Sequence, residues 1–358
     1  MKGWNWIVIA CQLLLISIVL AGCSKPFENS KTPAVTAAAE ATSETQDVAP
    51  GSGDALNGVR WIEISTPKGP FKVWTRKVGN NPRIKILLLH GGPGMTHEVF
   101  EVFDDFFPQE GFEYYYYDQL GSYFSDQPED DSLWTLQRFV DEVEQVRQTL
   151  GLDGSNFYLY GQSWGALLAM EYALQHPQGM KALIVSNMVA SVPSYARYAE
   201  EVLAPQLPPA VLAEVRQLEA RGDYDNPRYQ ELLMQYFYTA HVLRKPLADW
   251  PDAVNRTLKH MNPAVYVPMQ GPSEFGISGR LEHWDRSQDL SRIEVPTLVI
   301  GAKYDTMDPE YMRWMSTQFP QGQFLYCANG SHLALYDDQQ TYMQGLIDFI
   351  HQVDEKTL

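Results

Sequence analysis

A short apolar run leads directly into a serine flanked by glycines at Phe157-Tyr158-Leu159-Tyr160-Gly161-Gln162-Ser163-Trp164-Gly165. The first four residues have the length and composition of a buried strand, and residues 164–175 have the pattern of a helix. A serine at such a strand-to-helix turn is held at the edge of a sheet, and the glycines remove side chains that would clash there. The stretch therefore predicts that Ser163 is a nucleophile.

Short apolar runs of this kind recur along the chain. They lie at 84–89, 112–117, 182–185, 297–300 and 324–327, and two alternating runs precede them at 61–64 and 71–74. Helical patterns occupy residues 133–150, 164–175, 310–319 and 341–352. Strands that alternate with helices predict a mostly parallel sheet with helices on both faces. Together with the serine turn, this order predicts an α/β-hydrolase fold.

One long segment interrupts the alternation of strands and helices. Residues 191–289 have helical periodicity and several prolines but no convincing strand run. We expect this segment to form a helical cap that is inserted into the hydrolase core. The core is then divided into a first part, residues 58–190, and a second part, residues 290–358.

The N-terminus predicts export and attachment to a membrane. An apolar run at residues 6–20 ends in Leu20-Ala21-Gly22-Cys23, which resembles a bacterial lipobox. Residues 1–23 are therefore expected to form a lipoprotein signal peptide, with Cys23 lipidated; an uncleaved membrane anchor is the alternative. Ser24 resembles the residue found in lipoproteins of the Gram-negative outer membrane that face the periplasm. Residues 24–57 have almost no large apolar groups and predict a flexible tether.

The composition limits the classes of partner and cofactor. Hydrophobic residues make up 45% of the 358 residues, enough for a sizeable core, and the formal charge of −17 disfavours nucleic acid as a partner. With Cys11 removed and Cys23 lipidated, Cys327 has no partner for a disulfide and is expected to be a small buried residue. No cluster of Cys and His and no dinucleotide motif follows a strand, so neither a metal nor an organic cofactor is expected. The sequence does not define the oligomeric state.

An acid and a histidine follow the last two strand runs, in the order that this fold requires. Asp305 comes first after the run at 297–300, with Asp308 as the alternative acid three residues later. His332 follows the run at 324–327 and is the expected base. Ser163, His332 and Asp305 are therefore predicted to form a catalytic triad.

A glycine-rich loop follows the strand run at 84–89 and reads His90-Gly91-Gly92-Pro93-Gly94. Glycines at this place allow backbone N–H groups to approach a reacting carbonyl group, as in the oxyanion holes of lipases and esterases. The backbone N–H groups of Gly92 and Trp164 are the predicted donors. His90 itself is expected to be structural.

The glycine-rich loop, Asp118-Gln119-Leu120-Gly121 and the serine motif together resemble the proline iminopeptidases. That family includes prolyl aminopeptidases, the tricorn-interacting aminopeptidase and bacterial L-amino acid amidases, and the resemblance extends from about residue 59 to the C-terminus. Two positions differ from the family pattern, because Ala166 and Tyr123 stand where the family usually has glycine. Tyr123 is expected to place a bulky ring near the mouth of the site.

The resemblance also implies a site for a free α-ammonium group, since these enzymes remove one N-terminal residue. In the family a pair of carboxylates in the cap holds this group. The candidates in this chain are Glu274, in a turn flanked by glycine and proline, and Glu231, on an amphipathic helix.

These observations predict a serine aminopeptidase or amidase that works through an acyl-enzyme. Its expected substrates are small peptides or amino acid amides, and proline is one candidate for the N-terminal residue. An esterase or lactonase using the same triad is the first alternative. A non-catalytic binding protein anchored at the cell surface is the second alternative.

Overall fold

The structure is a computed structural model, and it describes residues 57–357. The predicted signal peptide at 1–23, including Cys23, lies outside the described residues, as does the predicted tether at 24–57 except for its last residue.

An eight-stranded sheet forms the centre of the molecule, with the strand order β1-β2-β4-β3-β5-β6-β7-β8. β2 pairs with β1 and β4 in antiparallel fashion, and the strands from β4 through β8 run parallel. The strand bounds are β1 (Val59–Thr66), β2 (Gly69–Val78), β3 (Lys85–Leu89), β4 (Glu113–Asp118), β5 (Phe157–Gln162), β6 (Ala182–Ser186), β7 (Thr297–Ala302) and β8 (Gly322–Cys327). Each overlaps a strand run expected from the sequence, and the mostly parallel sheet of the α/β-hydrolase fold is confirmed.

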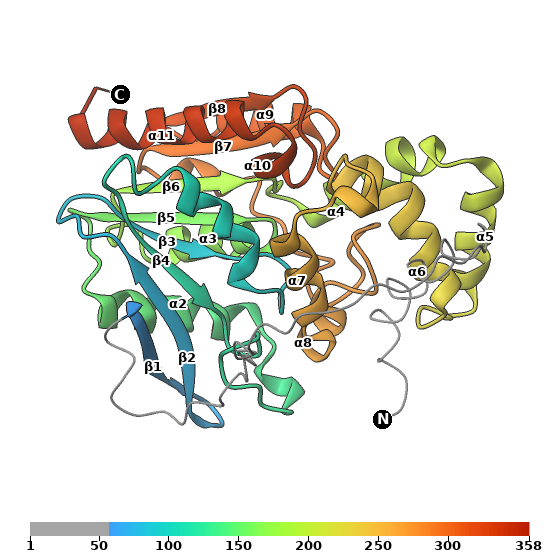
Figure 1. Ribbon diagram of the computed structural model, residues 1–358, viewed down its shortest axis with the longest axis horizontal. Helices are drawn as coiled ribbons and strands as arrows, with labels where there is room; N and C mark the ends of the chain where they lie inside the picture. Colours follow the sequence, from blue (N-terminus) through green and yellow to red (C-terminus); the bar gives the residue numbers. More distant parts are fainter. Residues whose placement is uncertain (1–56, 358) are drawn as a thin grey trace, which may run out of the picture.

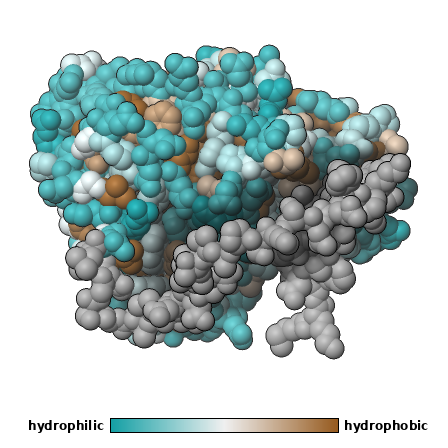
Figure 2. Space-filling model, viewed as in Figure 1, coloured by the Kyte–Doolittle hydropathy of each residue, from teal (hydrophilic) through white to brown (hydrophobic). Residues whose placement is uncertain are grey.

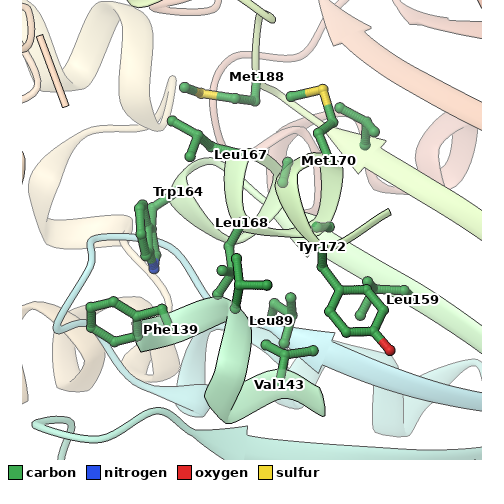
Figure 3. Packing of buried hydrophobic residues seen from close by; sticks show 14 of the residues in the cluster. Leu89, Phe139, Val143, Leu159, Trp164, Leu167, Leu168, Met170, Tyr172 and Met188 are labelled. Carbon is green, nitrogen blue, oxygen red and sulfur yellow. The ribbon is translucent and has the colours of Figure 1, made fainter. Parts of the chain in front are cut away.

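The central strands are buried along almost their whole length because helices cover both faces of the sheet (Figure 1). Neighbouring residues of a strand point to opposite faces. Leu87 and Leu89 of β3 belong to the cluster that contains side chains of α2 (Leu136–Leu150) and α3 (Trp164–Gln175). Ile86 and Leu88 belong to the cluster of η2 (His97–Asp105) and α11 (Gln339–Glu355). Figure 3 shows the first cluster, in which Phe139 of α2 and residues of α3 surround Leu89.

The helices of the core are η2 (His97–Asp105), η3 (Asp131–Leu133), α2 (Leu136–Leu150), α3 (Trp164–Gln175), η8 (Leu290–Arg292), α9 (Pro309–Ser316), α10 (Ala334–Asp337) and α11 (Gln339–Glu355). The helix expected at residues 133–150 is α2, and its expected start was wrong by three residues. The hydroxyl of Thr135 accepts a hydrogen bond from Arg138 N and caps α2, while Asp130 caps the separate short helix η3.

Helices also fill the segment between β6 and β7. They are α4 (Val192–Tyr198), η4 (Ala199–Leu203), η5 (Ala204–Gln206), α5 (Pro209–Ala220), α6 (Pro227–Leu233), η6 (Met234–Val242), η7 (Leu247–Asp249), α7 (Asp252–His260) and α8 (Pro263–Met269). We call this segment the cap; it lies beside the sheet in yellow and orange (Figure 1). An isolated bridge between Ser191 and Asp285 brings its two ends together.

The visible face of the molecule is mainly hydrophilic, with hydrophobic residues in small scattered groups (Figure 2). Across residues 57–357 we find no helix with the length and hydrophobicity needed to cross a membrane.

Two glycines allow α3 to approach the sheet closely after the serine turn. A Cβ atom on Gly165 would lie 2.0 Å from the carbonyl oxygen of Leu89, and a Cβ atom on Gly161 would lie 2.1 Å from that of Gly165. Both contacts are with backbone, which cannot rotate away. The serine turn therefore requires glycine at both positions.

We expect Gly165→Ala to destabilise the protein by about 3 kcal/mol or more, since the added methyl group overpacks rigid backbone. In thermal unfolding this corresponds to a fall in Tm of about 6 °C or more. Gly179→Ala is the matched control, because its Cβ atom would meet nothing closer than the hydroxyl of Tyr172 at 3.3 Å. Equal Tm values for the two variants would contradict the close approach of α3.

Candidate active site

Ser163 stands at the turn between β5 and α3, as the sequence predicted. Its backbone has φ 56° and ψ −126°, a conformation that non-glycine residues rarely adopt and that costs about 1–3 kcal/mol. The turn is held by a hydrogen bond from Ser163 N to the carbonyl oxygen of Ser186, at 3.0 Å, and by one from Ala166 N to Ser163 O, at 2.8 Å. The side chain is thereby fixed at the carboxyl end of the sheet and at the start of a helix.

Asp305 and His332 form a buried pair close to the ends of β7 and β8. Nδ1 of His332 lies 2.8 Å from Oδ1 of Asp305, and the carboxylate is fully buried. Burial lowers the pKa of His332, but the charge of Asp305 and its hydrogen bond outweigh burial, so the pKa is raised overall. Asp308, the alternative acid, instead caps α9 by accepting from Glu310 N at 2.9 Å. The geometry therefore pairs Asp305 with the histidine.

Ser163 and His332 line one cavity between the core and the cap, together with Glu274. Most of the other lining residues are apolar and come from the glycine-rich loop, η2, η6 and α7. They are Met95, Val99, Gln162, Tyr238, Val242, Trp250, Val254, Thr257, Leu258 and Leu333. Among residues 57–357, no cluster of three or more His, Cys, Asp or Glu side chains could hold a metal ion.

The two predicted oxyanion donors lie on either side of the serine turn. Trp164 is the first residue of α3, so its N–H group has no partner within the helix. The glycine-rich loop approaches the turn closely, since a Cβ atom on Gly91 would lie 3.2 Å from Cβ of Ser163. In the described part of the chain, neither Gly92 N nor Trp164 N donates a hydrogen bond to another protein group. Both N–H groups are therefore free to bind a ligand.

The three motifs of the family are joined by one buried side chain, Gln119. Its Oε1 accepts from Nε1 of Trp164 at 2.8 Å, and its Nε2 donates to the carbonyl oxygen of His90 at 3.1 Å. The N–H group of Gln119 donates to Nε2 of His90, also at 3.1 Å. Burial lowers the pKa of His90 to about 4, so the ring is neutral at neutral pH and has a structural role. Gln119 thus holds the glycine-rich loop against the serine turn.

Glu274 is buried at the cap side of the cavity and is surrounded by tyrosines. The hydroxyl of Tyr266 donates to Oε1 of Glu274 at 2.5 Å, and that of Tyr195 donates to its carbonyl oxygen at 2.5 Å. Glu274 N donates to the hydroxyl of Tyr238 at 3.1 Å. Burial raises the pKa of the Glu274 carboxyl group, which lacks a cationic partner in this environment. A bound cation would therefore find a preformed and poorly solvated carboxylate.

The structure does not bring Glu231 to the cavity. This side chain is exposed on α6 and forms a surface ion pair with Arg228 at 3.1 Å. Glu274 is the one carboxylate among the residues that line the cavity. The expectation that Glu231 could complete a pair is therefore wrong for this structure.

Tyr123 is also absent from the cavity lining. Its ring stacks on His260 and Phe124, with centroid distances of 4.1 and 3.9 Å. The backbone of Tyr123 has φ 26°, which explains why glycine suits this position in relatives. The ring packs between His260 of the cap and Phe124 of the core, and the expectation that it lies near the mouth of the site stays a prediction.

The cap is attached directly to the loop that carries the histidine. His332 N donates to the carbonyl oxygen of His241 at 2.9 Å, and Leu333 N donates to that of Val242 at 2.8 Å. These two bonds join the end of η6 to the histidine itself and to the residue that follows it. Two cavity residues, Tyr238 and Val242, lie on η6 itself.

Sequence reasoning missed two groups of residues at the site. Tyr195, Tyr238 and Tyr266 surround Glu274 but come from separate cap helices, and no local pattern relates them to that residue. Asn187 donates to Asp305 and lies two residues after the apolar run at 182–185. Its position at the carboxyl end of a parallel strand is the same signal that identified Asp305 and His332.

Comparison with known proteins agrees with this architecture. Residues 85–339 match the family model described as the alpha/beta hydrolase fold. A proline iminopeptidase from Flavobacterium johnsoniae is 59% identical over 295 residues, covering 82% of this chain and 99% of the relative. The crystal structure of VinJ has a TM-score of 0.76 at 29% identity, covering 82% of this chain and 99% of that chain. The proline iminopeptidase of Mycobacterium smegmatis has a TM-score of 0.73 at 28% identity, covering 84% and 100%. The chain belongs to the proline iminopeptidase family of α/β hydrolases.

Proposed function

We propose that this protein is a serine aminopeptidase that releases an N-terminal residue, proline foremost, from small peptides or amino acid amides. The observation that carries the proposal is that Ser163, His332 and the buried Glu274 line one cavity. The first two groups suit attack on a carbonyl group, and the third suits the ammonium group of the same residue. Relatives named proline iminopeptidase, at 55–59% identity, support proline as the residue released.

Catalysis follows from the roles that these positions suit. His332 takes the proton of the Ser163 hydroxyl as its oxygen attacks the carbonyl carbon of the N-terminal residue. The N–H groups of Gly92 and Trp164 bind the oxyanion that forms. His332 then gives the proton to the leaving amine, and the peptide bond breaks to leave an ester on Ser163. Water repeats the sequence and releases the amino acid.

Asp305 makes His332 suitable for both proton transfers. Its carboxylate accepts from Nδ1, which leaves Nε2 free to take the proton of the serine hydroxyl. The negative charge also stabilises the imidazolium that forms during each attack. Because the base must be neutral to accept a proton, activity should rise with pH through the raised pKa of His332.

Glu274 gives the cavity its preference for a free N-terminus. A protonated α-amine beside the carboxylate favours the charged form of Glu274 and replaces the ion pair that the buried group lacks. The largely apolar lining then encloses the side chain of a single residue. An internal peptide bond would place a neutral amide against the carboxylate, so hydrolysis is restricted to the first residue.

The proposal extends to the cell envelope, on the basis of Leu20-Ala21-Gly22-Cys23. Lipidation of Cys23 would attach the enzyme to a membrane through its N-terminus, in Gram-negative cells at the outer membrane facing the periplasm. Peptides that reach this compartment would then be the substrates.

Cys23→Ala should abolish labelling with radioactive palmitate, because the thiol that would carry the lipid is lost. Cys11→Ala is the matched control, since this residue precedes the lipobox, and its labelling should equal that of the wild type. A wild-type protein that is found in the membrane fraction without any labelling would indicate an uncleaved anchor instead.

Asp305→Asn should lower kcat by about ten-thousandfold, as the same change does in chymotrypsin-like proteases, because the amide holds the wrong imidazole tautomer. Asp308→Asn is the control: asparagine caps a helix as well as aspartate does, so kcat should be unchanged. Steady-state kinetics on a prolyl anilide measures both. The opposite ranking of the two variants would make Asp308 the acid.

Glu274→Gln should lower kcat/KM for a prolyl anilide by at least about tenfold, because a charge-assisted hydrogen bond of roughly 1.5–3 kcal/mol is lost. A simple acetate ester has no ammonium group, so its hydrolysis should hardly change. Glu231→Gln is the matched control, since this exposed carboxylate lies outside the cavity.

The same experiment tests the proposed function. Ser163→Ala should abolish turnover of both substrates, and N-acetylation of the prolyl anilide should protect it from the wild-type enzyme. If Glu274→Gln slowed both substrates equally, Glu274 would be structural. If acetylated and free substrates were cleaved equally well, the protein would be an esterase or general amidase.

A further inference from the structure

Asn187 occupies the position directly after β6, in the space between β5 and β7. It is fully buried and its backbone has φ 53°, in the left-handed region. Asparagine tolerates this region better than most residues, although glycine adopts it more easily still. Backbone conformation alone would favour glycine at this position, so asparagine must be present for its side chain. The contacts of that side chain show its role.

The carboxamide of Asn187 has partners that fix its orientation. Nδ2 donates to Oδ2 of Asp305 at 2.6 Å and to the carbonyl oxygen of Ser331 at 3.3 Å. Oδ1 accepts from the hydroxyl of Ser186 at 2.7 Å. Both partners of Nδ2 are acceptors only, so the reverse orientation of the amide would place oxygen against oxygen.

The hydrogen bonds of Asp305 divide between its two oxygens. Oδ1 faces His332 Nδ1 and also accepts from Met307 N at 3.2 Å, whereas Oδ2 accepts from Asn187 at 2.6 Å. A partial rotation of the carboxylate would turn both oxygens away from their partners and break the bond to Asn187. The amide of Asn187 therefore opposes the motion that would misplace the histidine.

We propose that Asn187 is a positioning residue that holds the Asp305 carboxylate and, through Ser331, the loop of His332 in register for catalysis. The inference rests on the proposed triad and adds to it a fourth residue from β6. Asn187 acts through Asp305 and does not touch the substrate.

A chain of hydroxyl groups supports Asn187 from behind. Ser186 Oγ lies 2.7 Å from the hydroxyl of Tyr342, which lies 2.5 Å from that of Tyr160. Because Ser186 donates to Asn187, its oxygen is left to accept from Tyr342, and Tyr342 in turn can accept from Tyr160. All donors then point toward Asp305, and such chains polarise one another. The carboxylate is thus connected to α11 and to β5.

Several ionisable groups act on His332, and their effects must be separated from that of Asn187. Asp305 lies beside Nδ1, Glu274 faces it from the cap, and Asp337 acts from α10. His241, on η6, lies close enough to Asp305 to be affected by its charge. A change confined to residue 187 leaves all four of these groups in place.

Two variants test the proposal with prolyl anilide as substrate. Asn187→Asp keeps the size and tolerates the same backbone, but places a second carboxylate 2.6 Å from Asp305 in place of a donor. We expect kcat to fall by about 100-fold at neutral pH, with KM within about threefold. The added negative charge should raise the apparent pKa of the acidic limb of the kcat/KM profile by about one unit or more. Asn187→Gly removes the donor without backbone strain and should lower kcat by about tenfold or more.

Asn156→Asp is the matched control, because Asn156 is also a buried asparagine but lies at the other end of the sheet, where its Oδ1 accepts from Asp153 N. Its pH profile should equal that of the wild type. If the Asn187 variants fold, as judged by Tm, and keep kcat within threefold and an unchanged pH profile, the proposal is wrong.

Ser186→Ala decides the question if the Asn187 variants do not fold. It removes only the hydroxyl that orients the amide, and kcat should fall about two- to fivefold with KM unchanged; unchanged kcat would overturn the proposal. Failure of the proposed function gives a different result, since the N-acetylated prolyl anilide would then be cleaved as well as the free one, whatever the Asn187 variants do.

Discussion

The close approach of α3 to the central strands is the constraint on which the site depends. The helix can begin immediately after β5 only because Gly161 and Gly165 present no side chain to the backbone around them. That approach forces Ser163 into a strained conformation and leaves the first N–H group of the helix without an internal partner. One steric condition therefore provides a nucleophile that lines the cavity and, beside it, a donor for the charge that develops during attack.

Buried polar side chains connect, by hydrogen bonds, the loops that meet at the carboxyl end of the sheet. Gln119 connects the glycine-rich loop to the serine turn, and Asn187 connects the end of β6 to the acid. Each contributes one amide whose oxygen and nitrogen face different loops. A buried amide left without either partner would lose free energy, so each of these contacts keeps two loops in one relative position.

The sequence predicted the sheet and the triad well because these depend on local patterns. A buried parallel strand is apolar along its whole length, and catalytic groups follow such strands, so Asp305 and His332 could be located from their order. The cap was harder, because its cavity is assembled from helices that are distant in sequence. From the sequence, Glu231 on its helix and Glu274 in its turn were both candidates for binding the ammonium group. In the structure Glu231 pairs with Arg228 at the surface, whereas Glu274 lies buried among tyrosines. The position of Asn187 near the end of a strand run was a usable signal. Its amide group neither titrates nor attacks a substrate, however, so residue type alone did not predict a role for it.

The hydrogen bonds between η6 and the histidine loop limit how a substrate can enter. His332 N and Leu333 N are bound to the carbonyl oxygens of His241 and Val242. These bonds fix this edge of the cap to the core, so the edge can act as a hinge but not as an entrance. A cap that opens while keeping these bonds swings about that edge, so the gap widens with distance from the imidazole. The geometry of the base can then persist through each cycle of opening, and the enzyme need not rebuild its proton-transfer path when a new peptide arrives.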